Sequence, residues 1–238
     1  MVSVHPERVT VVVLICADAE WTAVQELLEQ PACSQSPIGD WFQHPLVVSG
    51  ASLPVLFIHG GWGKIAAAAS TQYAIDRWSP ELLVNLGTCG GFEGRVERGE
   101  ILLVESTLVY DILEQMGDTE DHVAHYTTHL DLSWLSPAHP QPVRRTILVS
   151  ADRDLLPGDI LRLADRYGAV AGDWESGAIA WVAARNGCRC LILRGVTDLV
   201  SSQGGEAYGD LAMYQQATHA IMHRLLDMLP GWLAAAGK

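Results

Sequence analysis

Three acidic residues lie where predicted strands and helices meet: Glu20, Glu175 and Asp198. Carboxyl groups held in one site can give and take protons during catalysis, and a carboxylate can stabilise a positively charged ligand. Each acid also has a structural explanation, because Asp and Glu favour helix N-termini and Asp caps them. The elements that position the three acids decide between the two explanations.

One stretch of the chain places two of these acids beside a helix and a strand. Apolar residues recur at helical spacing over 178–183, so Glu175 lies at the start of a predicted helix. Residues 188–196 are apolar and bounded by turn signals, which indicates a buried strand with Asp198 at its end. In open α/β sheets, ligands bind outside the carboxyl ends of the strands, where Asp198 falls.

The third acid follows the first strong strand signal. Residues 9–16 form a near-continuous β-branched and aliphatic run, which is typical of a strand buried on both faces. An amphipathic helix is predicted over 21–30, so Glu20 lies near a strand-to-helix turn on the ligand side of a parallel sheet. The alternative is an exposed acid in the first helical turn.

The remaining pattern alternates strands with helices. Strands are predicted at 46–48 and 55–59 (as a hairpin), 82–86, 101–104 and 146–150, and helices at 65–78, 159–167 and 209–229. The glycine-rich segment 87–91 would let backbone N–H groups approach a ligand, although a ligand-free tight turn has the same pattern. Residues 109–145 are irregular and could form a lid or a subunit contact. The alternation predicts an α/β fold, a single domain over 1–238, with a mostly parallel sheet flanked by helices.

Composition narrows the class of protein. With 238 residues, of which 49% are hydrophobic, the chain can bury a large core. A formal net charge of -13 argues against duplex binding, which needs clustered Lys and Arg, so no nucleic-acid partner is expected. Five cysteines, odd in number and without framework spacing, indicate a reducing compartment. The apolar run 9–17 is too short for a membrane span and lacks a cleavage-site pattern, which predicts a soluble cytoplasmic protein with no membrane partner.

Three further motifs do not predict a cofactor or a metal. The pattern G-x-G-x-x-A over 61–66 fits a dinucleotide fingerprint, but no acid follows the next strand to hold a ribose. Lys64 does not belong to a phosphate loop, because Ile65 stands where Ser or Thr is required. Three histidines within 122–129 lack the surroundings of a metal site and are expected to be exposed loop residues. No cofactor and no metal are therefore expected.

Five segments, taken in chain order, resemble one family. They are Ala17-Asp18-Ala19-Glu20, Gly61-Trp62-Gly63-Lys64, residues 85–91 (NLGTCGG), Asp173-Trp174-Glu175 and residues 194–198 (RGVTD). In this order they resemble the nucleoside phosphorylase superfamily, and within it the 5′-methylthioadenosine/S-adenosylhomocysteine nucleosidases. The resemblance implies a three-layer α/β/α domain with a mixed, partly barrel-like central sheet of the phosphorylase/hydrolase-like type. It also implies a homodimer, no cofactor and a purine nucleoside as the small-molecule partner.

The resemblance further implies a catalytic role for each acid. Asp198 would be the general acid that protonates N7 of the purine, because a neutral base leaves more readily. Glu175 would bind the ribose hydroxyls and stabilise the positively charged sugar, and Glu20 would orient and deprotonate the attacking water. The reaction would hydrolyse the N-glycosidic bond of a 5′-substituted purine nucleoside of the methylthioadenosine or adenosylhomocysteine type, a step of nucleoside catabolism and methionine salvage.

The same resemblance implies a set of substrate-binding residues: Thr88, Trp62, Asp173, Trp174, Arg153, Asp154, Arg194, Thr197 and Tyr208. Among them, Arg194 would hold Asp198 or its neighbours in place. Arg153 and Asp154 stand where the nucleosidases carry an aromatic ring that stacks on adenine. This departure leaves the base and the 5′-group open, and a futalosine-type nucleoside is among the alternatives.

One position favours hydrolysis over phosphorolysis. Bacterial purine phosphorylases of this superfamily hold phosphate with an arginine just before the glycine-rich segment, whereas this chain has Asn85 there, and residues 17–28 contain no Arg or Lys. A dianionic nucleophile without a cation would bind poorly, so water is the predicted nucleophile. Two alternatives remain: a phosphate-dependent phosphorylase with a reorganised phosphate site, and a non-catalytic nucleoside-binding protein on the same fold.

Overall fold

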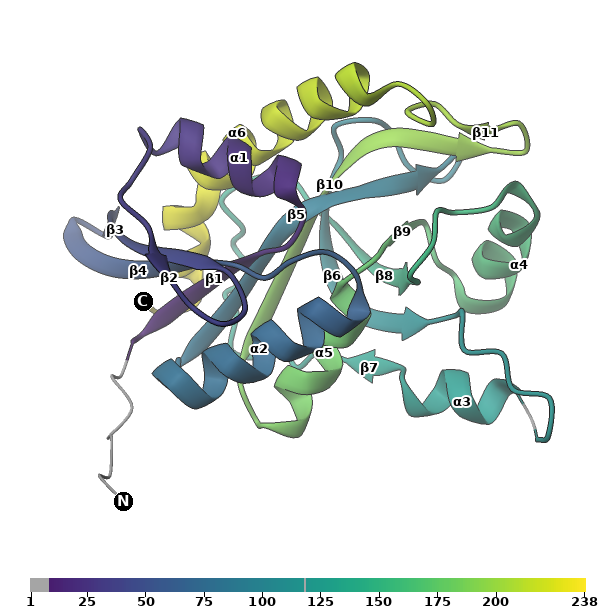
Figure 1. The fold of residues 1–238 in the computed structure, drawn as a ribbon, viewed down its shortest axis with the longest axis horizontal. Helices are drawn as coiled ribbons and strands as arrows, with labels where there is room; N and C mark the ends of the chain where they lie inside the picture. Colours follow the sequence, from purple (N-terminus) through teal and green to yellow (C-terminus); the bar gives the residue numbers. More distant parts are fainter. Residues whose placement is uncertain (1–8, 118) are drawn as a thin grey trace.

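Among the residues that the computed structural model describes, 9–117 and 119–238, eleven strands form one mixed sheet (Figure 1). Residues 1–8 and 118 of the predicted domain lie outside this description. The strands are β1 (Val11–Ile15), β2 (Ser34–Gln35), β3 (Asp40–Val48), β4 (Ala51–His59), β5 (Leu82–Phe92), β6 (Ile101–Val109), β7 (Thr128–His129), β8 (Arg144–Ser150), β9 (Ala171–Asp173), β10 (Cys190–Ser201) and β11 (Gly204–Gly205).

Part of this sheet closes on itself. β5 pairs with β10 in parallel, β10 with β6 antiparallel, β6 with β8 and β8 with β9 in parallel, and β9 returns antiparallel to β5. On the other side of β5, the strands β1, β4, β3 and β2 continue the sheet as an open wing. The sheet is therefore mixed and partly barrel-like, as the family resemblance implies, and the prediction of a mostly parallel sheet is wrong.

Helices cover both faces of the sheet, which makes three layers (Figure 1). The helices are α1 (Asp18–Leu27), α2 (Lys64–Trp78), α3 (Thr119–His125), α4 (Pro157–Tyr167), α5 (Ser176–Arg185) and α6 (Leu211–Ala235). α1 packs on α6, and α2 packs on α5. Alternate residues of β1 point to opposite faces, so Val13 joins the core under α1 and α6 while Val12 and Leu14 join the core under α2 and α5. Burial on both faces explains why β1 is continuously apolar.

Two strands run further than predicted, and both corrections concern the candidate site. β5 continues through the glycine-rich segment to Phe92, and β10 continues to Ser201, so Asp198 lies within a strand and not at its end. The segment requires glycine because there is no room for larger side chains. A Cβ atom at Gly91 would lie 2.6 Å from Val96 and 2.7 Å from Val196.

Other elements differ from the prediction at their ends. The hairpin of β3 and β4 is confirmed, but β3 begins at Asp40, before the predicted start at residue 46. The last helix continues through Pro230 to Ala235, because Trp232 and Leu233 are fully buried and hold the final turns against the core. The irregular region 109–145 contains the short helix α3 and the strand β7.

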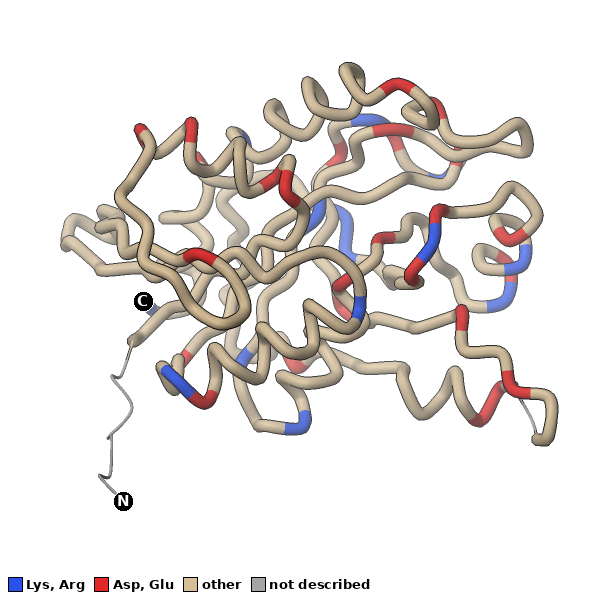
Figure 2. Tube along the Cα trace, viewed as in Figure 1, with Lys and Arg blue, Asp and Glu red and all other residues tan. Residues whose placement is uncertain are grey.

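Charge is distributed without a basic face. In the part of the chain that is drawn, Lys and Arg are interleaved with Asp and Glu along the trace (Figure 2). A surface that binds duplex nucleic acid requires one-sided clusters of basic residues. Of the helices in the described part of the chain, none has the length and apolar character that crossing a membrane requires.

Candidate active site

A cavity of about 550 Å³ opens beside β5, β9 and β10. Among the predicted site residues, these line the cavity: Glu20, Trp62, Thr88, Arg153, Asp154, Asp173, Trp174, Glu175, Thr197, Asp198 and Tyr208. Arg194 does not line it, because its side chain lies behind the cavity wall at 1% exposure. The fold thus brings residues from both halves of the chain to one site.

Glu20 is fixed by contacts from two elements. It lies in the first turn of α1, and its Oε2 accepts a hydrogen bond from the Ala17 N–H at 3.2 Å. Its Oε1 accepts from the backbone N–H of Thr88 at 2.6 Å and from the Thr88 hydroxyl at 2.9 Å. With 5% exposure, Glu20 is not the exposed first-turn acid of the alternative reading. The carboxylate is therefore held rigidly at the cavity wall.

Glu175 stands just before α5 and reaches the start of α2. Its Oε1 accepts a hydrogen bond from the Gly63 N–H at 2.8 Å. The neighbouring N–H of Lys64 donates to Asp152 at 2.6 Å. The backbone N–H groups at the start of α2 are thus occupied by the protein's own acidic side chains.

Behind the cavity, a buried ion pair supports the acids. Arg194 donates from Nε to Asp173 Oδ2 at 2.8 Å and from Nη2 to Asn85 Oδ1 at 2.6 Å. Asp173 also accepts from the Ser150 hydroxyl at 2.6 Å and from the Ser176 N–H at the start of α5. The resemblance implied that Arg194 holds Asp198 or its neighbours, whereas in the structure Arg194 holds Asp173, two residues before Glu175.

Asp198 enters the cavity at an irregularity in its strand. The pairing of β10 with β5 shifts register between Val196 and Asp198, which is a β-bulge. Such bulges redirect side chains next to active sites. The Thr197 hydroxyl lies 2.8 Å from Asp198 Oδ1 and 3.2 Å from the carbonyl oxygen of Cys89. Asp198 is 6% exposed, so its carboxyl group is largely removed from water.

Burial shifts the pKa of two of the acids in the same direction. Desolvation raises the pKa of Asp198, although hydrogen bonds from Thr197 and Ala207 lower it in part. Desolvation, together with the charges of Asp173 and Glu20, raises the pKa of Glu175 from 4.5 to about 8. Carboxyl groups whose pKa is raised by burial and by neighbouring charges are characteristic of catalytic sites.

The raised pKa of Glu175 predicts a pH-dependent gain in stability on removing its charge. The folded state holds the Glu175 proton more tightly than the unfolded state, so protonation of Glu175 favours folding. This stabilisation is complete below pH 4.5 and is lost as pH rises through about 8. The difference between the two pKa values corresponds to at most about 5 kcal/mol. We expect Glu175→Gln to stabilise the free protein by about 2 kcal/mol at pH 9, with little gain at pH 4.5.

Urea unfolding at the two pH values measures this difference. Glu97 is exposed, so Glu97→Gln is the matched control for removing a carboxylate without removing a buried charge. An equal effect of Glu175→Gln on the free energy of unfolding at pH 4.5 and pH 9 would contradict the assignment of the proton to Glu175.

Aromatic residues form the rim of the cavity. Trp62 and Trp174 meet edge to face, with ring centroids 5.7 Å apart, and Trp62 is 61% exposed. Tyr208 donates from its hydroxyl to the carbonyl oxygen of Leu155 at 2.8 Å. The segment before α6 is thus joined to the segment after β8 across the cavity.

The charged pair that replaces a stacking ring lies after β8. Arg153 donates to Asp159 at 2.5 Å and lies over the ring of Tyr110, with 5.2 Å between the guanidinium carbon and the ring centroid. Its charge is therefore engaged outside the cavity. Asp154, which is exposed, lines the cavity beside it.

Leu155 and Tyr214 are among the lining residues that were not predicted as part of the site. Leu155 extends the segment 153–154 into the cavity wall, and Tyr214 approaches from the first turns of α6. Further along α6, Ile221 is buried in the core, whereas Leu211 and Tyr214 in the first turns line the cavity. A tyrosine within a stripe of aliphatic residues is the available signal, because its hydroxyl requires a polar neighbour.

The histidines of the irregular region contribute no metal centre. His122 and His125 lie in α3, so the prediction of loop histidines is wrong in its secondary structure. Within 9–117 and 119–238, no group of three or more His, Cys, Asp or Glu side chains is arranged to hold a metal ion.

Comparison with known proteins connects this geometry to a family. The sequence profile of the phosphorylase superfamily matches residues 11–227. A 5′-methylthioadenosine/S-adenosylhomocysteine nucleosidase of Maridesulfovibrio salexigens is 22% identical over 234 residues, which cover 91% of this chain and 97% of that protein.

Solved structures show the same fold. The 5′-methylthioadenosine nucleosidase of Arabidopsis thaliana in its apo form aligns with a TM-score of 0.72 and 20% identity, covering 98% of both chains. The 5′-methylthioadenosine/S-adenosylhomocysteine nucleosidase of Neisseria meningitidis in complex with methylthio-immucillin-A aligns with a TM-score of 0.71 and 16% identity, covering 94% of this chain and 98% of that one. Since the family profile spans nearly the whole chain, this protein belongs to the phosphorylase superfamily.

Proposed function

We propose that this protein hydrolyses the N-glycosidic bond of a purine nucleoside and releases the base. The observation that carries the proposal is the convergence of Glu20, Glu175 and Asp198 on one cavity. Two of these acids have environments that raise their pKa, while Glu20 accepts three hydrogen bonds. Carboxyl groups in contrasting environments are suited to separate acid and base roles.

In the proposed reaction, the bond between the anomeric carbon and the base nitrogen breaks as a water oxygen bonds to that carbon. Asp198 gives its proton to N7 of the base, so the base leaves neutral. Its raised pKa supports this role, because an acid must still hold its proton when substrate binds. Glu20 takes the proton that the water loses, which restores the balance of charge.

Glu175 is proposed to bind the ribose hydroxyls. In the free site it keeps its proton near neutral pH, because burial and two neighbouring carboxylates disfavour its charge. Hydroxyl groups that donate to a carboxylate favour the ionised form, and so does a positive sugar. We therefore infer that substrate binding displaces this proton and prepares the charge that stabilises the transition state.

The charge partners around the cavity support water over phosphate as the nucleophile. Of the described residues that line the cavity, Arg153 is the one with a cationic side chain, and its charge is paired with Asp159. Arg194 is paired with Asp173 behind the wall. A phosphate dianion would have to break one of these pairs before it could bind.

The substrate we propose is a 5′-substituted nucleoside of the methylthioadenosine or adenosylhomocysteine type. The relatives named above are nucleosidases for such compounds. The indole rings of Trp62 and Trp174 add apolar surface to the cavity rim that suits a thioether substituent. Asp154 lines the cavity at the position where the family has a stacking ring, so the resemblance does not determine which base this protein prefers.

A base-release assay tests the proposal. Methylthioadenosine, adenosylhomocysteine, adenosine, inosine and futalosine are each incubated with the protein, with and without phosphate. Free base and free sugar without phosphate would support hydrolysis and rank the 5′-groups. Release that requires phosphate and yields the sugar 1-phosphate would replace hydrolysis by phosphorolysis. Binding of a nucleoside without turnover would indicate a non-catalytic binding protein.

We also propose that the protein is a cytoplasmic homodimer. Large apolar side chains near the start of α2 and after β6 are strongly exposed, with Ile65 at 85% and Met116 at 98%. Exposed apolar residues of this kind favour a protein interface. The five cysteines are unpaired in the structure, which suits a reducing compartment. Light scattering on the purified protein measures the oligomeric mass.

A further inference from the structure

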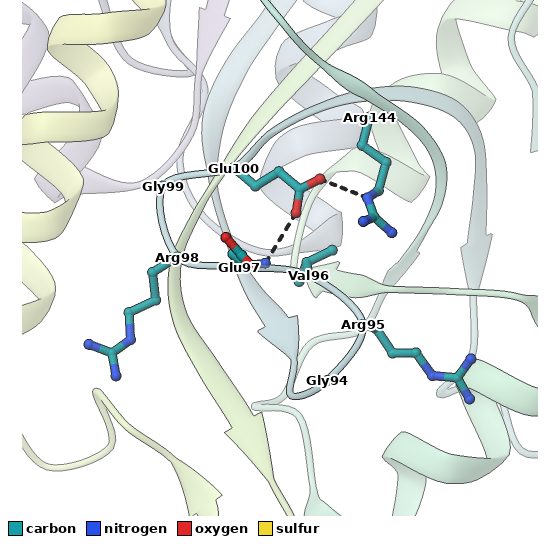
Figure 3. A pocket seen from close by; sticks show the side chains of 8 residues that line it. All are labelled: Gly94, Arg95, Val96, Glu97, Arg98, Gly99, Glu100 and Arg144. Atoms are coloured by element: carbon teal, nitrogen blue, oxygen red, sulfur yellow. Dashed lines mark hydrogen bonds and ion pairs between the residues drawn. The ribbon is translucent and has the colours of Figure 1, made fainter.

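The turn between β5 and β6 braces β10 from the side away from the catalytic cavity. The Gly99 N–H donates to the carbonyl oxygen of Val196 at 2.8 Å, and the Val196 N–H donates to the carbonyl oxygen of Glu100 at 3.0 Å. Figure 3 shows the turn with Arg95 and Arg98 pointing away from each other, and with Glu100 between Arg144 and the Glu97 backbone. These contacts meet β10 next to the bulge that carries Asp198.

A single carboxylate connects this turn to the strand segment that follows Asp198. Glu206 accepts a hydrogen bond from Arg98 Nη2 at 2.5 Å with Oε1, and from the Leu199 N–H at 2.8 Å with Oε2. The Glu206 N–H donates back to the Leu199 carbonyl oxygen at 3.0 Å. Two hydrogen bonds between Glu206 and Leu199 therefore join the segment after β11 to the residue directly after Asp198. Arg98 binds the other carboxylate oxygen of Glu206, Oε1.

The residues next to Glu206 reach into the site. The Ala207 N–H hydrogen-bonds the Asp198 carboxyl group, and Tyr208 closes over the cavity to Leu155. Any displacement of Glu206 would move the donor to Asp198 and the rim residue together. Surface ion pairs by themselves add little stability, so the contacts of Glu206 beside Asp198 give the Arg98–Glu206 pair a role in the site.

We propose that Glu206 is a positioning residue for Asp198, and that Arg98 holds Glu206 in place from the far side of β10. This inference rests on the proposed function, in which Asp198 is the acid. It extends the functional unit beyond the cavity to a pair whose side chains are 57% (Arg98) and 31% (Glu206) exposed.

The charges around Asp198 give the inference a signed test. The charged and titratable groups that act on Asp198 are Glu206 and Tyr208 from the segment after β11, Arg98 from the β5–β6 turn, and Cys89 from β5. Glu206 raises the pKa of Asp198 and Arg98 lowers it. Removing the charge of Glu206 should therefore lower the titration midpoint of Asp198, and removing Arg98 should raise it. General loosening of the fold would shift the midpoint in the same direction in both variants.

The primary experiment follows the Asp198 carboxyl carbon by NMR titration of protein labelled with ¹³C-aspartate, with the resonance assigned by its loss in Asp198→Asn. We expect Glu206→Gln to lower the Asp198 titration midpoint by about 0.5 pH units and Arg98→Ala to raise it by about as much. Arg95→Ala is the matched control, because Arg95 lies on the same turn and pairs with Asp165 at 2.9 Å, away from Asp198. Unchanged midpoints in both test variants would overturn the inference.

Kinetics supply the second readout. We expect Glu206→Ala to lower kcat about tenfold with KM within about twofold, because a misplaced acid weakens the transition state and not substrate binding. Glu206→Gln, which still accepts from Leu199, should recover most of kcat. A Glu206→Ala variant with wild-type kcat would overturn the positioning role. If the wild-type protein releases no base, the proposed function fails, while the NMR midpoints still decide whether this pair acts on Asp198.

Discussion

Replacing Asp198 with asparagine is expected to lower the rate of base release by about a thousandfold. Asparagine has nearly the same shape but cannot give a proton to N7, so the purine would have to leave as an anion. The Thr197 hydroxyl, 2.8 Å from Asp198 Oδ1, can still bond to the amide oxygen, so the fold should be retained. Rates under saturating substrate, with circular dichroism as a check of folding, measure the effect.

The matched control for this prediction is Asp154→Asn. Asp154 lines the same cavity, so the same chemical change there tests whether any lost carboxylate would suffice. We expect Asp154→Asn to change KM or the preferred base and to leave kcat on the best substrate within about tenfold. Wild-type turnover by Asp198→Asn would show that the leaving base receives its proton from another group.

The second large effect is expected on stability. Arg194→Met should lower the free energy of unfolding by about 3–5 kcal/mol, because it leaves a buried carboxylate and a buried amide oxygen without their donor. Arg194 is 1% exposed and bonds Asp173 and Asn85, which have 8% and 0% exposure. Although burial alone would lower the pKa of Arg194, Asp173 and Glu20 raise it, so the guanidinium is charged throughout the useful pH range. Urea unfolding at pH 7 measures the loss.

Two comparisons make this stability prediction specific. Arg162→Met removes an exposed ion pair with Asp159 at 3.1 Å and should cost less than about 1 kcal/mol. The double variant Arg194→Met with Asp173→Asn should recover part of the loss, because the unpaired charge is then gone. Equal losses for Arg194→Met and Arg162→Met would mean that the buried pair contributes no more than a surface pair.

The strands that form the core could be predicted because their own residues determine them. β1 is apolar on both faces, and that pattern is visible without knowledge of its neighbours. The carboxyl halves of β5 and β10 could not be predicted in this way, since glycine and aspartate are poor strand formers. Residues 87–91 stay extended because β10 pairs with them on one side and β9 pairs with Gly90 and Gly91 on the other, which is a non-local property.

The lining of the site could be predicted in large part, while its internal contacts could not. The resemblance offered Asp198 or its neighbours as the partner of Arg194, yet four residues along a strand span about 13 Å, too far for a direct contact between Arg194 and Asp198. Arg194 instead crosses to Asp173 of a different strand. Partners across a sheet depend on strand order, and the ring of five strands is not encoded in any local pattern.

The glycines of β5 separate the positions of the site that can be substituted from those that cannot. At Gly87 a methyl group would lie 2.8 Å from Glu20 and 2.9 Å from Arg194. We therefore expect neither natural variation nor directed evolution to replace this glycine. Residues 153–155 and 208–209 line the cavity outside the elements that carry the three acids and outside the Glu206 contacts that position Asp198. Libraries of variants confined to these two segments would change substrate preference while Glu20, Glu175 and Asp198 stay unchanged.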